Sequence, residues 1–466
     1  MTATNLSIPA LRDAVRGRVI VPEDVDYDPT RLTVSAVFDD RRPAAIVRAA
    51  DVEDVRRVVS LAREAGQDLA IRSGGHSMAG HSTTDSGIVL DLRELKGLEI
   101  DTVQKIASAG GGLTTGEYTT AAAEYGLATG FGDTASVGIS GITLGGGIGY
   151  LVRQHGLTID NLIAAEIVTA DGELRHVDVE HEPDLFWAIR GGGGNVGVVT
   201  RFTYRLHPVD TIVGGMLMLP ATPEVIAGFI ALADEAPEEL STIANVMTAP
   251  PMPFLPAELH GKLVLLALMS HAGDVEAGLR TVEPFRKLAT PIADMLRPGR
   301  YPDMYPPEEG EYRPLAVTRT MFLDTLDTGV AQTIIDHLEA SDAPMRVTQL
   351  RVLGGAMARV PSDATAFAHR SSRIMANLAS FYQGPDDRAR REAWIDAFAT
   401  ALRQDDQGAY VNFLSEEGEE GVRRAYPSPT WERLAAIKAR YDPTNLFRLN
   451  QNIPPRADLE ARTAAA

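Results

Sequence analysis

Glycine is concentrated in four short clusters, which restrict the folding of this chain more than any other feature of its sequence. The clusters are RSGGHS at 72–77, AGGGL at 109–113, SVGISGITLGGGIGYL at 136–151 and RGGGGNVGVV at 190–199. Glycine reaches backbone conformations that other residues avoid, and runs of glycine let backbone N–H groups approach an anion closely. The four clusters therefore predict loops that surround a large polyanionic cofactor.

One cluster contains the spacing of a dinucleotide-binding motif without the context of that motif. Gly192, Gly194 and Gly197 fit G-x-G-x-x-G, which should open a helix and be followed about twenty residues later by an acidic residue. Here GVVTRFTYRL continues as a strand, and residues 211–223 contain no Asp or Glu. A nicotinamide-type Rossmann fold is therefore disfavoured, and the phosphate-binding pattern G-x-x-x-x-G-K-[ST] does not occur.

Length and composition restrict the partners. A chain of 466 residues exceeds one compact core and should form two or three domains. The net charge of −19 argues against a nucleic-acid or anionic membrane surface, which leaves small molecules as partners. The absence of cysteine excludes disulfides and thiolate catalysis. With no signal-peptide core and no run of eighteen apolar residues, we expect a soluble cytoplasmic protein; its oligomeric state is not indicated.

Hydrophobic periodicity divides the chain into two regions that differ in their pattern of strands and helices. Residues 1–207 alternate strands and helices, including a helix over 51–66 capped by Asp51 and ended by Gly66, and a hairpin at Asp171-Gly172 with positive φ at both turn residues. From Pro208 onward, strands such as TIVGGMLMLP, GKLVLLALMS and VTQLRVL alternate with helical patterns such as TPEVIAGFIALADEAP. This change predicts a separate α/β unit in the middle of the chain.

Two histidines lie in the first glycine cluster and its continuation, IRSGGHSMAGHS. His76 and His81 are five residues apart, which is not the spacing of two ligands on one helix face, and no Asp or Glu lies between them. We therefore expect no metal site. A polar surface loop remains an alternative interpretation, because Gly, Ser and His all occur in turns.

Four ordered blocks carry a resemblance to a known family. They are IRSGGHSMAGHSTTDSGIVLDLRELKGLEID, SVGISGITLGGGIGYLVRQHGLTIDNLIAAEIVTADGEL, DLFWAIRGGGGNVGVVTRF and YDPTNLFRLNQNIPP. In this order they resemble the FAD-linked oxidoreductases of the berberine bridge enzyme-like family, within the vanillyl-alcohol oxidase and p-cresol methylhydroxylase (PCMH) fold superfamily. The resemblance covers nearly the whole chain and is strongest in the first 207 and last 60 residues.

The resemblance implies an α+β fold with a two-part, PCMH-type FAD-binding domain. Its N-terminal part would span 1–207, and 410–466 would complete it. An α/β substrate domain built on an antiparallel sheet would be inserted at 208–409.

The resemblance also implies which residues hold FAD. In the family, the histidine of the R-x-G-G-H block is bonded to the 8α-methyl group of the isoalloxazine, and that residue here is His76; His81 has no family role. The other expected cofactor-binding residues are Arg72, Ser73, Gly74, Gly75, Ser77, Val137, Gly138, Ser140, Gly141, Gly145, Gly147, Ile148, Val199 and Asn450.

The chain departs from the family at informative positions. Many members attach FAD a second time through a cysteine, whose place here is Thr134, so one covalent histidyl link is the most that this chain can form. Val137 stands where valine accompanies dioxygen reactivity in the family and leucine accompanies its suppression. We therefore expect an oxidase.

Oxidation of an alcohol also requires a base for the hydroxyl proton. The family often uses the tyrosine of a Y-x-N segment, which is Tyr410 with Asn412; the alternative is a strand tyrosine that packs its ring and hydrogen-bonds its hydroxyl. Tyr382 is a second candidate. The glutamate base of alkaloid-forming members is replaced by Arg359, which would favour an anionic or polyol substrate only if it faced the pocket.

The expected function is oxidation of a hydroxyl-bearing carbon of a sugar, alcohol or secondary metabolite, with hydride transfer to flavin N5 and reduction of dioxygen to hydrogen peroxide. Two alternatives stay open. One is a flavin dehydrogenase with another acceptor, and the other is a non-catalytic flavin protein that binds a metabolite.

Overall fold

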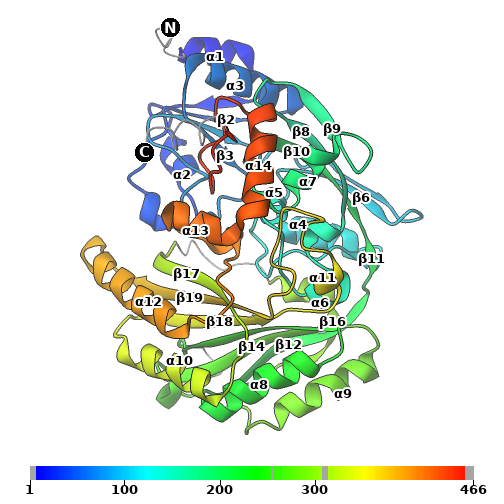
Figure 1. The fold of residues 1–466 in the computed structure, drawn as a ribbon, viewed down its shortest axis with the longest axis vertical. Coiled ribbons are helices and arrows are strands. Elements are labelled where there is room, and N and C mark those ends of the chain that lie inside the picture. The colour runs from blue at the N-terminus through cyan, green and yellow to red at the C-terminus, as the bar shows by residue number, and fades with distance from the viewer. Residues whose placement is uncertain (1–6, 253–254, 307–312, 457–466) are drawn as a thin grey trace.

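The computed structural model describes residues 7–252, 255–306 and 313–456, which form three principal sheets with helices around them (Figure 1). The fold is of the α+β class, as predicted from the sequence. Within the described residues, no helix combines the length and the apolar character that crossing a membrane requires.

The first sheet has the strand order β1-β2-β4-β3, built from Arg18–Ile20, Ala45–Arg48, Ile88–Asp91 and Leu69–Arg72. Strands β2, β4 and β3 run parallel, because helix α3 (Val52–Ala65) and the loop after β3 return the chain to the same edge. The helix begins and ends as predicted. The Asp51 side chain accepts the N–H of Asp54, and Gly66 ends the helix at φ +64°.

The second sheet is antiparallel, with the order β5-β6-β10-β8-β9. Its strands are Leu98–Asp101, Ile106–Gly110, Val198–Arg205, Leu162–Val168 and Leu174–Val177. The β8–β9 hairpin confirms the predicted turn at Asp171-Gly172, with one difference. Only Gly172 takes a positive φ, because Thr169 and Glu173 close a wider loop with a hydrogen bond of 3.1 Å.

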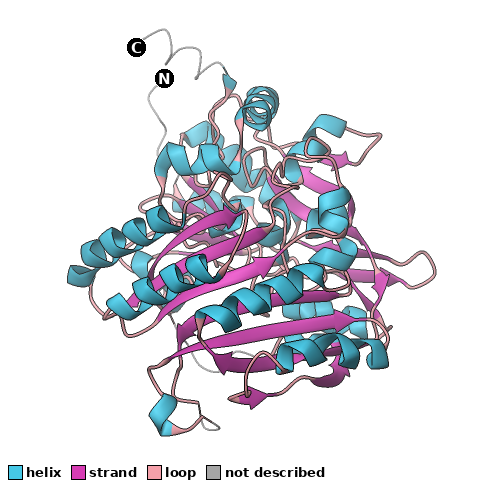
Figure 2. Ribbon diagram, turned by 60° about the horizontal axis from the view of Figure 1, so that its bottom comes forward, coloured by secondary structure: helices cyan, strands magenta, loops and turns pink. Residues whose placement is uncertain are grey.

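The third sheet has eight strands and is antiparallel throughout. Its main path is β15-β12-β14-β13-β18-β19-β17, built from Ala293–Asp294, Thr211–Pro220, Leu263–Ala272, Leu240–Thr248, Arg346–Val352, Ile374–Tyr382 and Leu315–Leu323, while β16 (Arg297–Arg300) pairs with β12. Helices α8 (Pro223–Glu235), α9 (Val275–Arg286), α10 (Thr328–Ala340) and α12 (Arg388–Leu402) cover one face (Figure 2). We call the opposite face, which lies toward the first two sheets, the inner face.

After the third sheet the chain returns to the first two. Helix α13 (Gly418–Ala425) leads into α14 (Ser428–Tyr441), which packs beside α7 (Pro183–Ile189), as the red-orange and teal ribbons of Figure 1 show. Trp431 and Leu434 of α14 share one buried cluster with Leu185 and Phe186 of α7. Burial of these side chains fixes the C-terminal segment against the N-terminal half of the chain.

Candidate active site

The four glycine clusters meet at one place between the sheets. The backbones at Gly74 and Gly138 lie so close that a Cβ on Gly74 would come within 2.2 Å of the Gly138 nitrogen. The Ser73 and Ser140 hydroxyls both donate to the Gly111 carbonyl, at 2.8 and 2.6 Å. Three of the clusters are thereby packed together through contacts that only glycine permits.

The fourth cluster joins them at the C-terminal end of helix α5 (Ile139–Leu144). The N–H groups of Gly191 and Gly193 both donate to the Leu144 carbonyl, at 3.1 and 2.9 Å. The Gly111 N–H also donates to the Thr200 carbonyl, just beyond Val199. Loops from four distant parts of the sequence therefore line one region.

His76 lies at the edge of this region. Its Nε2 shares a hydrogen bond of 2.8 Å with the Ser136 hydroxyl, and the imidazole is half-buried. The preceding Gly75 has φ +75°, a conformation that favours glycine and turns the chain so that the imidazole meets the second loop. Sequence reasoning found His76 but not Ser136, although Ser136 stands at the start of the SVG block.

Three glycines of these loops border space that the protein does not fill. A Cβ at Gly75 or Gly141 would meet no protein atom within 4 Å, and one at Gly194 would touch only the Asn450 side chain, at 4.0 Å. The Asn450 amide donates to the Gly194 carbonyl, while its buried Oδ1 has no hydrogen-bond partner within the described part of the chain. Open glycine walls and an unsatisfied amide oxygen fit a bound cofactor with polar groups along its length.

Tyr410 and Asn412 are held against the third glycine cluster. The Tyr410 hydroxyl oxygen accepts the Gly147 N–H at 3.0 Å and the Asn412 amide at 2.9 Å, and that amide also donates to the Ile142 carbonyl. Gly145 lacks the side chain that would collide with Asn412. The segment forms a 3-10 turn over Val411–Phe413, which corrects the alternative of a strand tyrosine.

The environment of Tyr410 acts on its acidity in two directions. Burial raises the pKa of Tyr410 above its ordinary value, because the phenolate loses hydration. The hydrogen bonds from Asn412 and Gly147, and the positive charge of Arg351, oppose this effect and lower the pKa. The fully buried phenol is therefore surrounded by groups that stabilise its anion.

Arg351 connects the third sheet to the glycine loops, and sequence reasoning missed it. The buried guanidinium on β18 donates to the Ile148 carbonyl and to the Asp133 carboxylate, both at 2.7 Å, and to Gln349 at 2.8 Å. It also lies over the Phe413 ring, which contacts Tyr410. An available signal was the alternation of Gln349 and Arg351 with apolar residues in VTQLRVL, since one face of that strand is polar.

Arg72, Ser77 and His81, which the sequence also singled out, make contacts within the protein. The Arg72 guanidinium is buried and donates to the carbonyls of Thr30, Arg31 and Ser82, so it holds the surrounding loops together. Ser77 accepts the His81 N–H. Burial, assisted by the nearby Arg41, lowers the pKa of His81 to about 4.

Two candidates lie away from Tyr410. Tyr382 ends strand β19 and packs into the core under the helices, on the face opposite Met375, which belongs to the cluster around Tyr410. Arg359 is exposed on the surface, where it pairs with Glu238. The structure thus places neither side chain beside the glycine loops.

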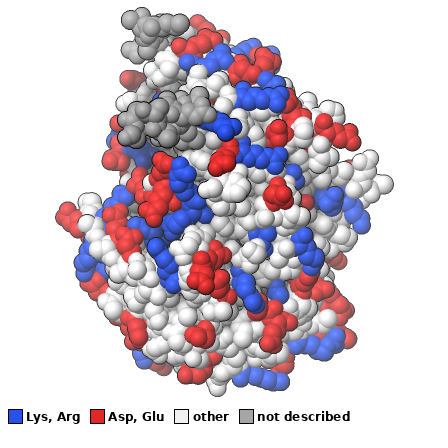
Figure 3. Space-filling model, in the orientation of Figure 1, with Lys and Arg blue, Asp and Glu red and all other residues white. Residues whose placement is uncertain are grey.

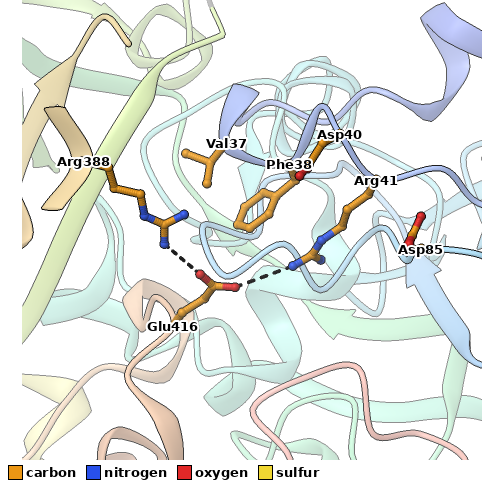
Figure 4. Close-up of a pocket in the computed structure, with 7 residues that line it drawn as sticks. All are labelled: Val37, Phe38, Asp40, Arg41, Asp85, Arg388 and Glu416. Carbon is orange, nitrogen blue, oxygen red and sulfur yellow. Dashed lines mark hydrogen bonds and ion pairs between the residues drawn. The ribbon is translucent and has the colours of Figure 1, made fainter. Parts of the chain in front are cut away.

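A separate polar pocket of about 250 Å³ lies between the N-terminal segment and α12 (Figure 4). Its main feature is Glu416, which bonds to Arg388 at 2.9 Å and forms an ion pair with Arg41 at 3.6 Å. The Glu416 charge is thereby compensated, and the residues around the pocket include neither His76 nor Tyr410. On the face shown in Figure 3, acidic and basic side chains are intermixed.

Comparison with known proteins identifies the family. Residues 43–178 match a model described as an FAD binding domain, and residues 409–454 match one described as berberine and berberine like. The FAD-linked oxidoreductase YgaK of Bacillus subtilis is 30% identical over 456 residues, covering 94% of this chain and 97% of the relative. The chain belongs to the berberine bridge enzyme-like family of FAD-linked oxidoreductases.

Relatives of this berberine bridge enzyme-like oxidoreductase include named oxidases. The (R)-6-hydroxynicotine oxidase of Paenarthrobacter nicotinovorans is 28% identical, with coverage of 95% of this chain and 97% of the relative. The xylooligosaccharide oxidase of Thermothelomyces thermophilus is 30% identical, with coverage of 91% and 90%. The crystal structure of 6-hydroxy-D-nicotine oxidase from Arthrobacter nicotinovorans superposes with a TM-score of 0.84 at 26% identity, covering 98% of this chain and all of that one.

These matches confirm the predicted family and cofactor. The berberine bridge enzyme-like protein is an FAD-dependent oxidoreductase, and the region matched by the FAD model contains His76, Gly111, Gly138 and Gly147. The C-terminal model match contains Tyr410, Asn412 and Asn450.

Proposed function

We propose that this enzyme is an oxidase that removes a hydride from a hydroxyl-bearing carbon of a small molecule and passes the electrons to dioxygen, forming hydrogen peroxide. The observation that carries the proposal is the Tyr410 hydroxyl, which accepts two hydrogen bonds beside the glycine loops. Related proteins named as oxidases support the same reaction class. We further propose that residues 208–409 form the substrate-binding unit, with substrate between this unit and the glycine loops.

The residues of the chain have distinct tasks in this proposal. FAD, when bound, supplies the isoalloxazine N5 that accepts the hydride. Tyr410 takes the hydroxyl proton of the substrate as its C–H bond breaks, so that no positive charge accumulates on the substrate oxygen. Asn412 and the Gly147 N–H stabilise the Tyr410 phenolate through preformed hydrogen bonds.

The glycine loops and Asn450 would hold the cofactor, and His76 would carry its single covalent link. The Ser136 hydroxyl fixes the imidazole by its bond to Nε2, which supports a defined direction of attack by the ring. Gly75, Gly141 and Gly194 border space in which the cofactor fits. No second tether is available, because the chain has no cysteine.

The link is tested by the visible spectrum of purified protein before and after acid precipitation, compared with the His76→Ala variant. We expect yellow colour to stay in the wild-type pellet and to leave the pellet of the variant. Release of all flavin from the wild type would contradict the covalent link. A protein that stays colourless after reconstitution with FAD would contradict the whole proposal.

Reaction with dioxygen requires its own test. Val137 is half-buried two residues before helix α5 and one residue after the Ser136 that contacts His76. We expect photoreduced enzyme to reoxidise in air within seconds, and the Val137→Leu variant to do so more slowly. A reduced form that persists in air would indicate a dehydrogenase with another acceptor. A flavin that no alcohol or sugar bleaches under anaerobic conditions would indicate a binding protein.

A further inference from the structure

The inner face of the third sheet carries a row of uncharged polar side chains in cross-strand register. Asn245, Gln349, Asn377 and Thr320 are paired neighbours on β13, β18, β19 and β17. They belong to the inner face because the residues that alternate with them, such as Leu350 and Leu378, pack under the helices. The row therefore crosses four neighbouring strands. We call each such set of cross-strand pairs a level of the sheet.

This polar row keeps hydrogen-bonding capacity for a ligand. The Gln349 amide donates to Asn245 Oδ1 at 3.1 Å, which fixes one end of the row. At the other end, Asn377 Oδ1 and the fully buried Thr320 hydroxyl have no hydrogen-bond partner among the residues that the structure describes. Unsatisfied buried groups destabilise a protein unless a ligand or water pairs with them.

An apolar strip continues from the polar row. It consists of Met247 and Val347, on β13 and β18, which are only partly buried on the same face and form a cross-strand pair one level beyond Asn245 and Gln349. Met216 and Leu268, also partly buried, pair with each other at the level of Ile243 and Arg351, on the other side of the polar row. Methionine side chains adapt to ligands of different shape, so the strip can accommodate an apolar group.

The polar row lies on the side of the strip nearer to Tyr410. On β18 and β19, one level before the row, stand Arg351 and Met375. Arg351 bonds to the Ile148 carbonyl, and Met375 belongs to the apolar cluster that contains Tyr410. The order from the candidate base outward is thus the Arg351 level, the polar row, and then the Val347–Met247 level of the apolar strip.

Charge on this face is confined to one residue. Among the described inner-face residues of β12, β13, β14, β17, β18 and β19, Arg351 alone is charged, and its guanidinium is paired with Asp133. A charged substrate would find no free counter-ion on the face. A linear polyol would place hydroxyl groups against the apolar strip, where they could not be satisfied.

We infer that the substrate is a neutral amphipathic alcohol, with a hydrogen-bonding group beside the reactive carbinol and an apolar tail that lies on the strip. This inference rests on the proposed oxidase function and narrows its substrate class. The neighbouring polar group pairs with Asn377 and Thr320, and the tail covers Met247 and Val347. Oligosaccharides and charged acids are thereby excluded as preferred substrates.

The test is a series of 1,2-alkanediols from butanediol to decanediol, compared with hexitol and xylobiose. We expect kcat/KM to rise about two- to fourfold for each added methylene until the strip is filled, and both polyols to react more slowly than hexanediol. The Met247→Gln variant should flatten this dependence. Met295→Gln is the matched control, because Met295 is exposed on the surface.

A binding measurement separates this inference from the oxidase proposal. Tertiary alcohols from 2-methyl-2-hexanol to 2-methyl-2-decanol have no carbinol hydrogen, so their affinity is read from perturbation of the flavin spectrum. Tail-dependent binding with no flavin reduction by any diol would support the inference and overturn the oxidase function. Preference for hexitol or xylobiose, or affinity independent of the tail, would overturn the inference and leave the oxidase function in place.

Discussion

Tyr410 combines complete burial with hydrogen bonds that favour its anion. Burial alone would make the phenol too weak an acid to leave a useful phenolate near neutral pH. The N–H of Gly147 and the amide of Asn412 both donate to its oxygen, so neither needs to reorient when the proton moves.

The Tyr410→Phe variant removes the candidate base and keeps the ring. We expect kcat to fall by about 10²- to 10⁴-fold, the usual contribution of a general base. The measurement is anaerobic flavin reduction by stopped flow, with the flavin absorbance of the variant as the control for cofactor retention. A variant that keeps its flavin and reduces it within a few-fold of the wild-type rate would rule out Tyr410 as the base.

Arg351 should set the pH at which Tyr410 becomes active. The base works as phenolate, so the rate of flavin reduction rises with pH through the pKa of Tyr410. The positive charge of Arg351 lowers that pKa, so its removal raises the pKa and moves the rising limb to higher pH. We therefore expect Arg351→Gln to shift the pH–rate profile upward.

The Arg351→Lys variant is the matched control, since it keeps the charge and loses the forked geometry that bonds Asp133, Ile148 and Gln349. Its profile should return most of the way to the wild-type position. An equal loss of rate at every pH in both variants would show that Arg351 has only a structural role.

Among the secondary-structure elements, sequence periodicity predicted those helices and strands whose positions are determined by residues close together in the sequence. Helix α3 has its N-cap Asp51 and its C-terminal Gly66 within the segment, and the segments predicted as strands from TIVGGMLMLP, GKLVLLALMS and VTQLRVL form β12, β14 and β18. The register between strands was not readable, because it depends on pairing partners distant in sequence. Without that register, the neighbours Asn245, Gln349 and Asn377 could not be recognised as one row.

Candidate site residues that stand in sequence motifs were predicted. Those that reach the site only through tertiary packing were missed. The glycine clusters, His76 and Tyr410 stand in recognisable blocks. Arg359 was placed by its position in a motif, and its surface location follows from the turn of α11 (Ala356–Arg359), which brings it to Glu238. Arg351 lies in an ordinary strand, and only the packing of β18 on the Ile148 loop reveals its contacts.

The C-terminal end of helix α8 is bonded by an arginine side chain from outside the third sheet and its helices. The Arg153 guanidinium, from α6 (Val152–His155), donates to the carbonyls of Asp234 at 3.2 Å, Ala236 at 2.9 Å and Leu240 at 3.3 Å. These carbonyls lie in the last turn of α8 and the connection to β13, where helical partners are lacking. Arg153 therefore ties the third sheet to the glycine-loop region through the end of a helix.

We expect Arg153→Ala to lower the free energy of unfolding by about 3 kcal/mol, because buried carbonyls lose charge-assisted hydrogen bonds. The measurement is urea denaturation followed by far-UV circular dichroism. The comparison variant is Arg280→Ala on α9, because the pair of Arg280 with Glu276 is solvent-exposed and should contribute less than about 1 kcal/mol. Equal stability of the two variants would contradict this role for Arg153.

At the scale of the whole molecule, the C-terminal segment returns to the N-terminal half of the chain. Lys438 and Asp442 of this segment are completely buried, 3.5 Å apart. The Lys438 ammonium also donates to the Phe447 carbonyl and to Asn452, while Asp442 accepts the N–H groups of Leu446 and Phe447. The pair thus shapes the turn that carries Asn450 to Gly194.

Replacement of Lys438 by methionine should leave the Asp442 carboxyl buried without its cation, which destabilises by about 3–5 kcal/mol. Because the same turn positions Asn450 against the proposed cofactor region, we expect less FAD to be incorporated, together with the lower thermal midpoint. The measurements are thermal unfolding and the flavin-to-protein absorbance ratio of the purified protein. The double variant Lys438→Met/Asp442→Asn removes the isolated charge, so it should recover stability over the single variant. If it were no more stable than Lys438→Met, the buried ion pair would not be what stabilises the turn that carries Asn450.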